Sequence, residues 1–366
     1  MSGILTPSVI ANEALLVLSN NLVAASLVYR GDTSTFTGAK VGDTITIRRP
    51  ANFSVQNFST TIAPQGVNEG SVAMTLERHF DMSIELTSRQ LTLNLEDFSE
   101  QVVRPAMVNF AEQIDSYIYS KYVELNEFVG DGNLNALTDL TAVDQRLMEL
   151  KVPMSGRVGF LSPLTRARFL ALPEAHRQDI RGERANPALT EASMGRLLSV
   201  DWYGAQGVVF HTAGVPGGTP TGTGTAGSTS VSVAAGGAAG TFRQGDIVTF
   251  AGHSQTYVVT ANATLNGSGA GTINIFPALV QAVSGAAITV APSHWANIVG
   301  HPRGLSVACV PLELPMEGDG AVVNYGGWAI RVVRRYDIQS KKNLISFDTL
   351  VGAKVTDPRL LVRYAG

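Results

Sequence analysis

A long stretch almost without charge constrains this chain most. Between Asp201 and Arg303 the only formally charged residues are Arg243 and Asp246. The stretch is rich in Gly, Thr, Ser, Ala and Val, a composition typical of short β-strands joined by tight turns. The flanking sequence carries charge at an ordinary density. We therefore expect an inserted β-rich module, with 214–240 as its entry linker.

Composition excludes several classes of protein. The chain has 366 residues, of which 45% are hydrophobic and 16% charged, so it can bury a large core and is not intrinsically disordered. A net charge of -3 excludes a strongly basic nucleic-acid binder and a polybasic membrane anchor. The single cysteine, Cys309, excludes an intrachain disulfide framework and a cysteine-based metal cluster. We also expect no signal peptide and no membrane-spanning helix.

The N-terminal part predicts a helix followed by a long hairpin. Apolar steps of three and four over 8–28 predict an amphipathic helix. Alternation over 41–50 and 72–86 predicts two strand arms around the polar segment 51–70. Neither feature has an adjacent partner in the sequence, so we expect both to bury surface on neighbouring subunits. Four charged residues near the hairpin root are the candidate intersubunit contacts: Arg48, Arg49, Glu77 and Arg78.

The strongest helix signal follows the hairpin. Asp97 and Glu100 have the spacing of a capping box, and apolar residues then recur every three or four positions from Val103 to Leu125. Pro105 predicts either a kink or a regular start near Arg104.

The remaining sequence alternates helix and strand signals without a repeat of 20–50 residues. Helices are predicted over 141–151, 162–172 and 188–198. Strands are predicted over 158–161, before Phe210, and over 305–312, 328–337, 344–350, 351–355 and 360–364. Within the insert, strands are predicted over 246–251, 256–261 and 272–276.

Motifs for chemistry are weak. Residues 222–227 match G-x-G-x-x-G, but no strand precedes them and no helix follows, which favours a flexible linker over a dinucleotide site. Residues 252–256 lack the second glycine of a nucleophile elbow and predict a turn. No histidine pair has metal-site spacing, and Cys309 lies in an apolar strand where a thiol packs as a hydrophobe. We predict no catalytic, cofactor-binding or metal residue, no cofactor and no enzyme activity.

The order of these elements resembles the major capsid protein fold of tailed double-stranded DNA bacteriophages, in the branch with an inserted β-barrel domain. The similarity covers nearly the whole chain. It rests on the order and spacing of 41–50, 104–106 with 114–115, 310–315 and 330–337, and, within the insert, 242–252, 257–261 and 272–278.

The resemblance implies an α+β fold with an N-terminal arm, an extended β-hairpin loop, a long spine helix, a central α/β domain and an inserted small all-β domain. The implied boundaries are 1–40 for the arm and 41–86 for the hairpin loop. A peripheral domain comprises 87–130 and 321–350, an axial α/β domain comprises 131–216, 292–320 and 351–366, and the inserted domain comprises 217–291.

The resemblance also implies a structural role in an icosahedral shell. Copies of the chain would form hexamers and pentamers with a scaffolding protein and a portal, in the host bacterial cytoplasm, and a decoration protein is a further possible partner. The shell would enclose double-stranded DNA without sequence-specific binding and without a membrane. Two alternatives stay open: a bacterial nanocompartment shell protein of the same fold, and a secreted β-rich binding protein. The inserted domain argues against the first, and the long helix argues against the second.

Overall fold

A computed structural model places the chain in two compact units. It describes residues 7–30, 44–49, 66, 70–87, 99–176, 194–234, 236–315, 319–339 and 342–366. The first unit comprises Met1–Leu22, Val28–Ala111 and Leu305–Asp357, and the second comprises Val23–Leu27, Glu112–Gly304 and Pro358–Gly366.

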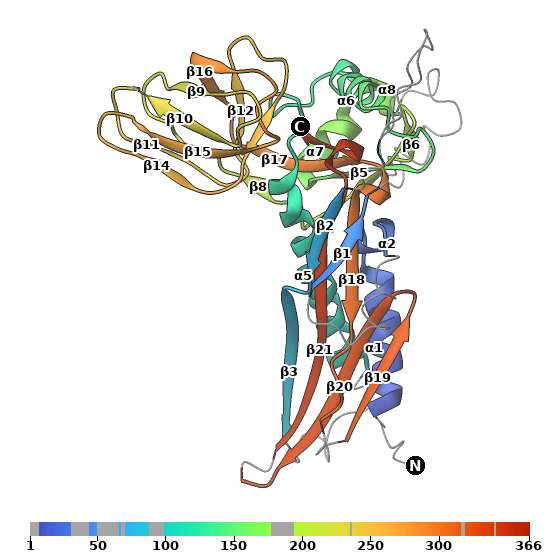
Figure 1. Cartoon of the computed structure of the whole chain (residues 1–366). Helices are drawn as coiled ribbons and strands as arrows, with labels where there is room; N and C mark the ends of the chain where they lie inside the picture. The colour runs from blue at the N-terminus through green and yellow to red at the C-terminus, as the bar shows by residue number, and fades with distance from the viewer. Residues whose placement is uncertain are drawn as a thin grey trace. The chain divides into compact units, whose positions relative to one another are not determined.

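The first unit is built on an antiparallel sheet around one long strand, β21 (Lys342–Val355). β20 (Trp328–Asp337) pairs with one edge of β21, and β19 (Asp319–Tyr325) follows as the outer strand. The opposite edge of β21 pairs with β3 (Arg78–Thr87) over Lys342–Val351, whereas β18 (Leu305–Val310) pairs with Leu350–Val355 on the same edge as β20. These strands run side by side in Figure 1. The strand predictions over 305–312 and 328–337 are confirmed, and those over 344–350 and 351–355 join into one strand.

The N-terminal helix packs on this sheet. α1 (Pro7–Asn21) lies against β19 and β20, and it buries Ile10, Ala14 and Leu18. The expectation that this helix buries its apolar face only on a neighbouring subunit is therefore wrong. Its partner is a sheet formed about 300 residues later in the chain, and local sequence carries no signal for that pairing.

The helix predicted over 8–28 is two helices. The second, α2 (Ala24–Leu27), belongs to the second unit. The carboxylate of Asp115 accepts hydrogen bonds from the backbone N–H groups of Val23, Ala24 and Ala25. These are the N–H groups that a helix start leaves without an internal partner. Burial raises the pKa of Asp115, and the three backbone hydrogen bonds oppose that rise.

The predicted hairpin is present, but its second arm is shorter than predicted. β1 (Thr44–Arg48) pairs antiparallel with β2 (Ser71–Thr75). After Leu76 the chain leaves the hairpin, and β3 joins the sheet through β21. Most of the predicted tip, 51–70, lies outside the described residues. The alternation over 72–86 therefore contains two strands with different partners.

The predicted long helix is confirmed, and its regular α-helical part begins at Arg104. A π-helical turn (Ser99–Val103) leads into α5 (Arg104–Ser120), and a 3-10 turn, η2 (Lys121–Glu124), ends it. Pro105 is the second residue of α5, where its missing N–H costs no helical hydrogen bond. Asp97 lies outside the described residues.

The second unit contains a mixed sheet of seven strands. Its order is β4-β22-β17-β5-β7-β6, and β8 also pairs with β17. Helices α6 (Leu137–Glu149), α7 (Pro163–Ala171) and α8 (Pro173–His176) belong to the same unit. The Ser162 side chain caps α7 as predicted, accepting a hydrogen bond from Thr165 N. The strands are β4 (Phe128–Val129), β5 (Arg157–Leu161), β6 (Arg196–Leu197), β7 (Val200–Gly204), β8 (Phe210–His211), β17 (His294–Gly300) and β22 (Leu361–Ala365).

The helix predicted over 188–198 is wrong in the part that the structure describes, 194–198. The helix predicted over 188–198 meets β6 at Arg196–Leu197, which pairs with β7. Residues 188–193 lie outside the described residues. Leu198 and Ser199 have positive φ angles of 51° and 61°, which is left-handed backbone that turns the chain from β6 into β7.

The insert is a closed barrel with the strand order β10-β15-β13-β12-β16-β9. Its core is formed by its own side chains, including Val231, Phe250 and Ile273. The barrel strands are β9 (Thr221–Gly224), β10 (Ser230–Ala234), β12 (Ile247–Phe250), β13 (Tyr257–Val259), β15 (Gly271–Phe276) and β16 (Val283–Val290), and β11 (Gly240–Phe242) pairs with β14 (Ala263–Leu265) beside them.

The interpretation of 214–240 as a linker is wrong. Two of the glycines in the G-x-G-x-x-G match, Gly222 and Gly224, lie in β9 of the barrel. A Cβ on Gly222 would lie 2.8 Å from the Phe250 ring, and one on Gly224 would lie 2.7 Å from Leu279 Cδ1. The glycines therefore let β9 pass close to large core side chains, which is neither a linker nor a phosphate loop.

Candidate functional site

The β1–β2 hairpin has one buried and one open face. Ile45, Ile47 and Met74 point to one side, where Met74 packs on Ala308 of β18 and is fully buried. Thr44, Thr46, Arg48, Ser71 and Ala73 alternate with them and share the other face, on which all five are exposed. The expectation that this hairpin makes no core contact is wrong for the first face.

The four candidate contact residues lie at two ends of this hairpin: Arg48 and Arg49 beside Ser71 and Gly70 at the end towards the tip, and Glu77 and Arg78 after β2 at the root. Arg48, Glu77 and Arg78 are exposed, Arg48 in β1, Glu77 between β2 and β3, and Arg78 as the first residue of β3. Arg49 is half-buried, and its backbone N–H donates to Gly70 O at 2.7 Å. The Nε atom of Arg49 is buried without a hydrogen-bond partner among the described residues. The structure thus separates Arg48 and Arg49 from Glu77 and Arg78 by the length of the β1–β2 ladder, and the role of all four between subunits stays a prediction.

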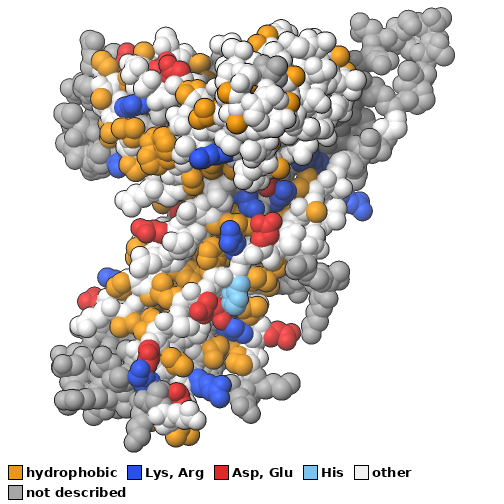
Figure 2. All heavy atoms as spheres, turned by 90° about the vertical axis from the view of Figure 1, so that its left-hand side faces the viewer, with side chains coloured by type: hydrophobic (Ala, Val, Ile, Leu, Met, Phe, Trp, Pro, Cys, Tyr) orange, Lys and Arg blue, Asp and Glu red, His pale blue; other side chains and the backbone are white. Residues whose placement is uncertain are grey.

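The main sheet of the first unit holds a largely buried ion pair between β20 and β21. Arg331 donates two hydrogen bonds to Asp348, from Nε to Oδ1 at 2.8 Å and from Nη2 to Oδ2 at 2.5 Å. Asp81 faces Asp348 across the β3–β21 pair and accepts a hydrogen bond from Ser346. Figure 2 shows acidic, basic and hydrophobic side chains interspersed along this unit.

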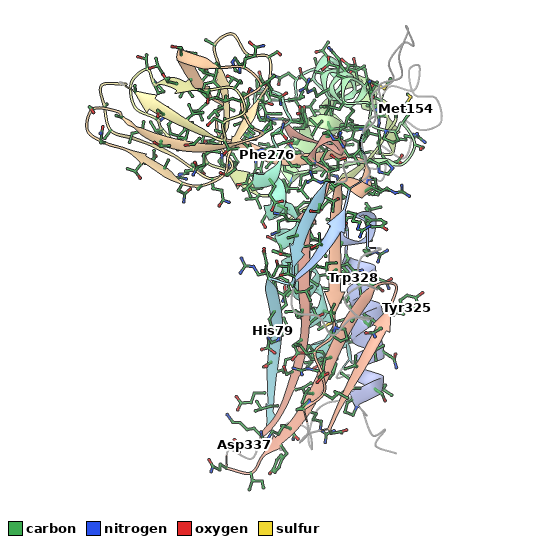
Figure 3. All side chains as sticks on the ribbon, in the orientation of Figure 1. His79, Met154, Phe276, Tyr325, Trp328 and Asp337 are labelled. Atoms are coloured by element: carbon green, nitrogen blue, oxygen red, sulfur yellow. The ribbon has the colours of Figure 1, made fainter. Side chains whose placement is uncertain are left out.

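The ends of β20 expose large apolar side chains. Tyr325 at the β19–β20 turn is 72% exposed, and Ile338 beyond the other end of β20 is 78% exposed. Tyr336 and Leu344 near Ile338 are also exposed. Figure 3 marks these two ends with Tyr325 and Asp337. Exposed apolar groups gathered at strand ends are typical of surfaces that another protein covers.

A polar cluster is buried where the barrel meets the mixed sheet. Asp246, in the turn before β12, accepts hydrogen bonds from His211 Nε2 at 2.8 Å, Gly214 N at 3.1 Å and Arg243 N at 2.7 Å. The other ring nitrogen of His211, Nδ1, lies 3.0 Å from the Tyr122 hydroxyl. The guanidinium of Arg363 lies 4.5 Å over the Tyr122 ring and donates to Gly245 O at 2.6 Å. We call Tyr122, His211, Asp246 and Arg363 the junction cluster.

Burial controls protonation around the junction cluster. Burial lowers the pKa of Arg363 to about 10, which still leaves the guanidinium charged at neutral pH. Burial, followed by the charge of Arg363, lowers the pKa of neighbouring His294 to about 3, so His294 is neutral. Burial also raises the pKa of Tyr122, so its hydroxyl keeps its proton. At neutral pH, Arg363 is therefore charged, and His294 and Tyr122 are neutral.

A second polar contact joins the barrel to the chain after the long helix. Buried Glu127 pairs with Arg146 of α6 at 2.5 Å and accepts a hydrogen bond from Gln255 Nε2 at 3.2 Å. Thr256 Oγ1 donates to Asn126 O at 2.6 Å. Gln255 and Thr256 are barrel residues, so the barrel is attached to the α/β part of its unit at two places.

No metal or nucleophile site accompanies these features in the part of the chain that the structure describes. No group of three His, Cys, Asp or Glu residues could hold a metal ion there. Cys309 is buried, burial raises the pKa of its thiol, and its Sγ lies 3.1 Å from Thr349 Oγ1. Among the described helices, none is both long and apolar enough to span a bilayer.

Sequence reasoning missed the junction cluster. Asp246 stood out only as one of two charges in the insert, while His211 and Arg363 had no visible relation to it. One signal was available: a single carboxylate next to the apolar run Ile247–Phe250 needs local hydrogen-bond donors if it is buried.

Comparisons with known proteins bear on the fold. No protein-family model matches the chain, and no curated protein matches it. A solved structure from Mycobacterium phage Che8 is similar over 94% of this chain and 90% of that chain, with a TM-score of 0.54 and 11% sequence identity. The chain has the tailed-phage major capsid fold. The expected α+β class with an inserted all-β element is thereby confirmed, and the barrel is that element.

Two further solved structures are similar at lower scores. The capsid structure of cyanophage P-SCSP1u matches with a TM-score of 0.48 and 8% identity, over 89% of this chain and 84% of that chain. The virus-like particle from Pyrococcus furiosus matches with a TM-score of 0.42 and 8% identity, over 96% of both chains.

Proposed function

We propose that this chain is the major capsid protein of a tailed double-stranded DNA phage, which assembles with copies of itself into an icosahedral shell. The observation that carries this proposal is the capsid fold, which the Che8 structure matches over 94% of the chain. A fold alone does not specify a function, so surfaces suited to assembly must support it.

Three surface features support assembly. The hairpin presents an open face that includes Arg48, next to a face already packed on β18. Large apolar side chains, among them Tyr325 and Ile338, are exposed at both ends of β20. The outer strand β19 pairs on one side only within the described residues and contains no lysine, proline or bulge. The unpaired backbone N–H and C=O groups of an edge strand can pair with another chain.

The finer parts of the proposal concern partners and place. We include hexamers and pentamers of this chain, a scaffolding protein, a portal and enclosed double-stranded DNA, with assembly in the host cytoplasm. We propose a structural role without enzyme activity, in which Arg48, Arg49, Glu77 and Arg78 contact a neighbouring subunit. We also include a decoration protein among the partners of the shell.

Sedimentation and electron microscopy of the purified chain test the proposal. We expect closed particles, or rings of five and six subunits that close when a scaffolding protein is added. Particles from producing cells should protect double-stranded DNA from nuclease. Particles that hold folded protein cargo and no DNA would favour the nanocompartment alternative. A chain that stays monomeric under every condition would contradict both shell functions.

A further inference from the structure

The carboxylate of Asp246, a barrel residue, is buried where the barrel meets the mixed sheet rather than inside the barrel. Asp246 is fully buried, yet two of its hydrogen-bond donors, His211 and Gly214 N, precede the barrel in the chain. Gly245, in the turn that holds Asp246, has a φ of 89°. A Cβ added to Gly245 would lie 3.0 Å from Val123 Cγ1, so this turn packs closely on η2 at the end of the long helix. The anion therefore sits at the contact between barrel and mixed sheet.

The mixed sheet supplies the balancing cation. Arg363 of β22 is fully buried and forms no ion pair among the described residues. Its Nη1 donates to a barrel carbonyl, Gly245 O, while Nε and Nη2 are buried without hydrogen-bond partners there. Tyr122 and His211 connect the two charges in an unbroken chain of contacts. Each side of the junction thus gives hydrogen-bond partners to a charge that the other side buries: Gly245 O accepts from Arg363, and His211 and Gly214 N donate to Asp246.

Separating the barrel from the mixed sheet is energetically unfavourable. A barrel held only by its two connecting segments could turn as a body. Here, turning would take Gly245 O from buried Arg363 and two hydrogen-bond donors from buried Asp246, or would require water to enter the junction. The hydrogen bonds of Gln255 and Thr256 to Glu127 and Asn126 lie at the second attachment and oppose the same motion.

We propose that the junction cluster is a latch that couples the barrel to the mixed sheet, so that the two open as one cooperative body. The proposal concerns the chain by itself and does not depend on the proposed function. It predicts reciprocal effects: a change on the barrel side loosens the sheet, and a change on the sheet side loosens the barrel.

Hydrogen–deuterium exchange of the full-length, unassembled chain tests this. Two strands outside the cluster serve as reporters, β15 for the barrel and β5 for the mixed sheet. Asp246→Asn removes the barrel charge and presents an amide N–H₂ to the donors around it. We expect exchange to accelerate about a hundredfold in β5 as well as in β15. Tyr122→Phe keeps the ring under Arg363 and removes one oxygen, so we expect about a tenfold acceleration in β15.

The matched control is Gln244→Ala, which removes an exposed polar side chain two residues from Asp246 and should leave both reporters unchanged. The double variant Asp246→Asn/Tyr122→Phe should exchange no faster than Asp246→Asn alone, because both changes break one network. The latch is refuted if Asp246→Asn affects only β15 and Tyr122→Phe only β5, or if their effects add. If Asp246→Asn does not fold, Tyr122→Phe decides by its effect on β15 alone.

Discussion

The two faces of the β1–β2 hairpin should respond to mutation in opposite ways. Met74 is fully buried in a small cluster with Ala308, flanked by half-buried Ile45, Ile47 and Leu76. Truncating a buried methionine to alanine costs about 2–5 kcal/mol, and a cluster with so few fully buried members puts Met74→Ala near about 2 kcal/mol. Arg48 lies on the open face, so Arg48→Ala should cost the isolated chain at most about 1 kcal/mol.

Thermal unfolding and light scattering separate these effects. A loss of about 2 kcal/mol lowers the melting temperature of a domain of 150–250 residues by about 4–8 °C. Buried Trp328 lies in the same unit and provides a fluorescence signal. Met74→Ala should lower the melting temperature by this amount. Arg48→Ala should leave it nearly unchanged and slow or block shell formation, because a contact buried between subunits costs about 2–5 kcal/mol when one partner is truncated.

Glu77→Ala is the second variant on the exposed side and should behave like Arg48→Ala. The reasoning fails if Arg48→Ala lowers the melting temperature as much as Met74→Ala while the folded protein assembles normally. It also fails if Met74→Ala leaves the melting temperature unchanged.

Three further predictions concern the second unit. Gly222→Ala should destabilise the barrel by about 1–3 kcal/mol, because the new Cβ would lie 2.8 Å from Phe250, whereas Gly267→Ala, with no atom within 4 Å, should be nearly neutral in urea unfolding. The fragment 217–291 should show β-type circular dichroism and cooperative unfolding, since its core side chains all lie within it; a random-coil spectrum would exclude this. Burial lowers the pKa of folded His294 to about 3, below the unfolded value near 6.5, so the neutral side chain contributes stability above about pH 6.5 that is lost as the pH falls towards 3. The stability difference between wild type and His294→Gln should shift across this range, and a constant difference would contradict it.

Local signals predicted individual elements well. Pro105 lies at the start of α5, and Ser162 with Pro163 starts α7, because capping and proline effects depend on a few adjacent residues. The apolar alternation of β20 likewise identified a strand without knowledge of its partners.

Long-range pairing was not predictable in the same way. β3 pairs with β21 although more than 250 residues separate their paired positions in the sequence. Met74 packs on Ala308 at a similar sequence separation. In the barrel, the glycines of β9 resembled a linker because the reason for them, the bulk of Phe250 and Leu279, lies further along the chain. The junction cluster joins Arg363 to Gly245 across 118 residues, and neither residue belongs to a motif.

Cryo-electron microscopy of particles formed by the purified chain tests the central claim most directly. The account predicts a closed icosahedral shell of fivefold and sixfold rings, in which a neighbouring subunit covers the exposed hairpin face around Arg48. It would be contradicted by a protein that forms no closed particle with or without scaffolding protein, or by a shell in which that face remains open to solvent.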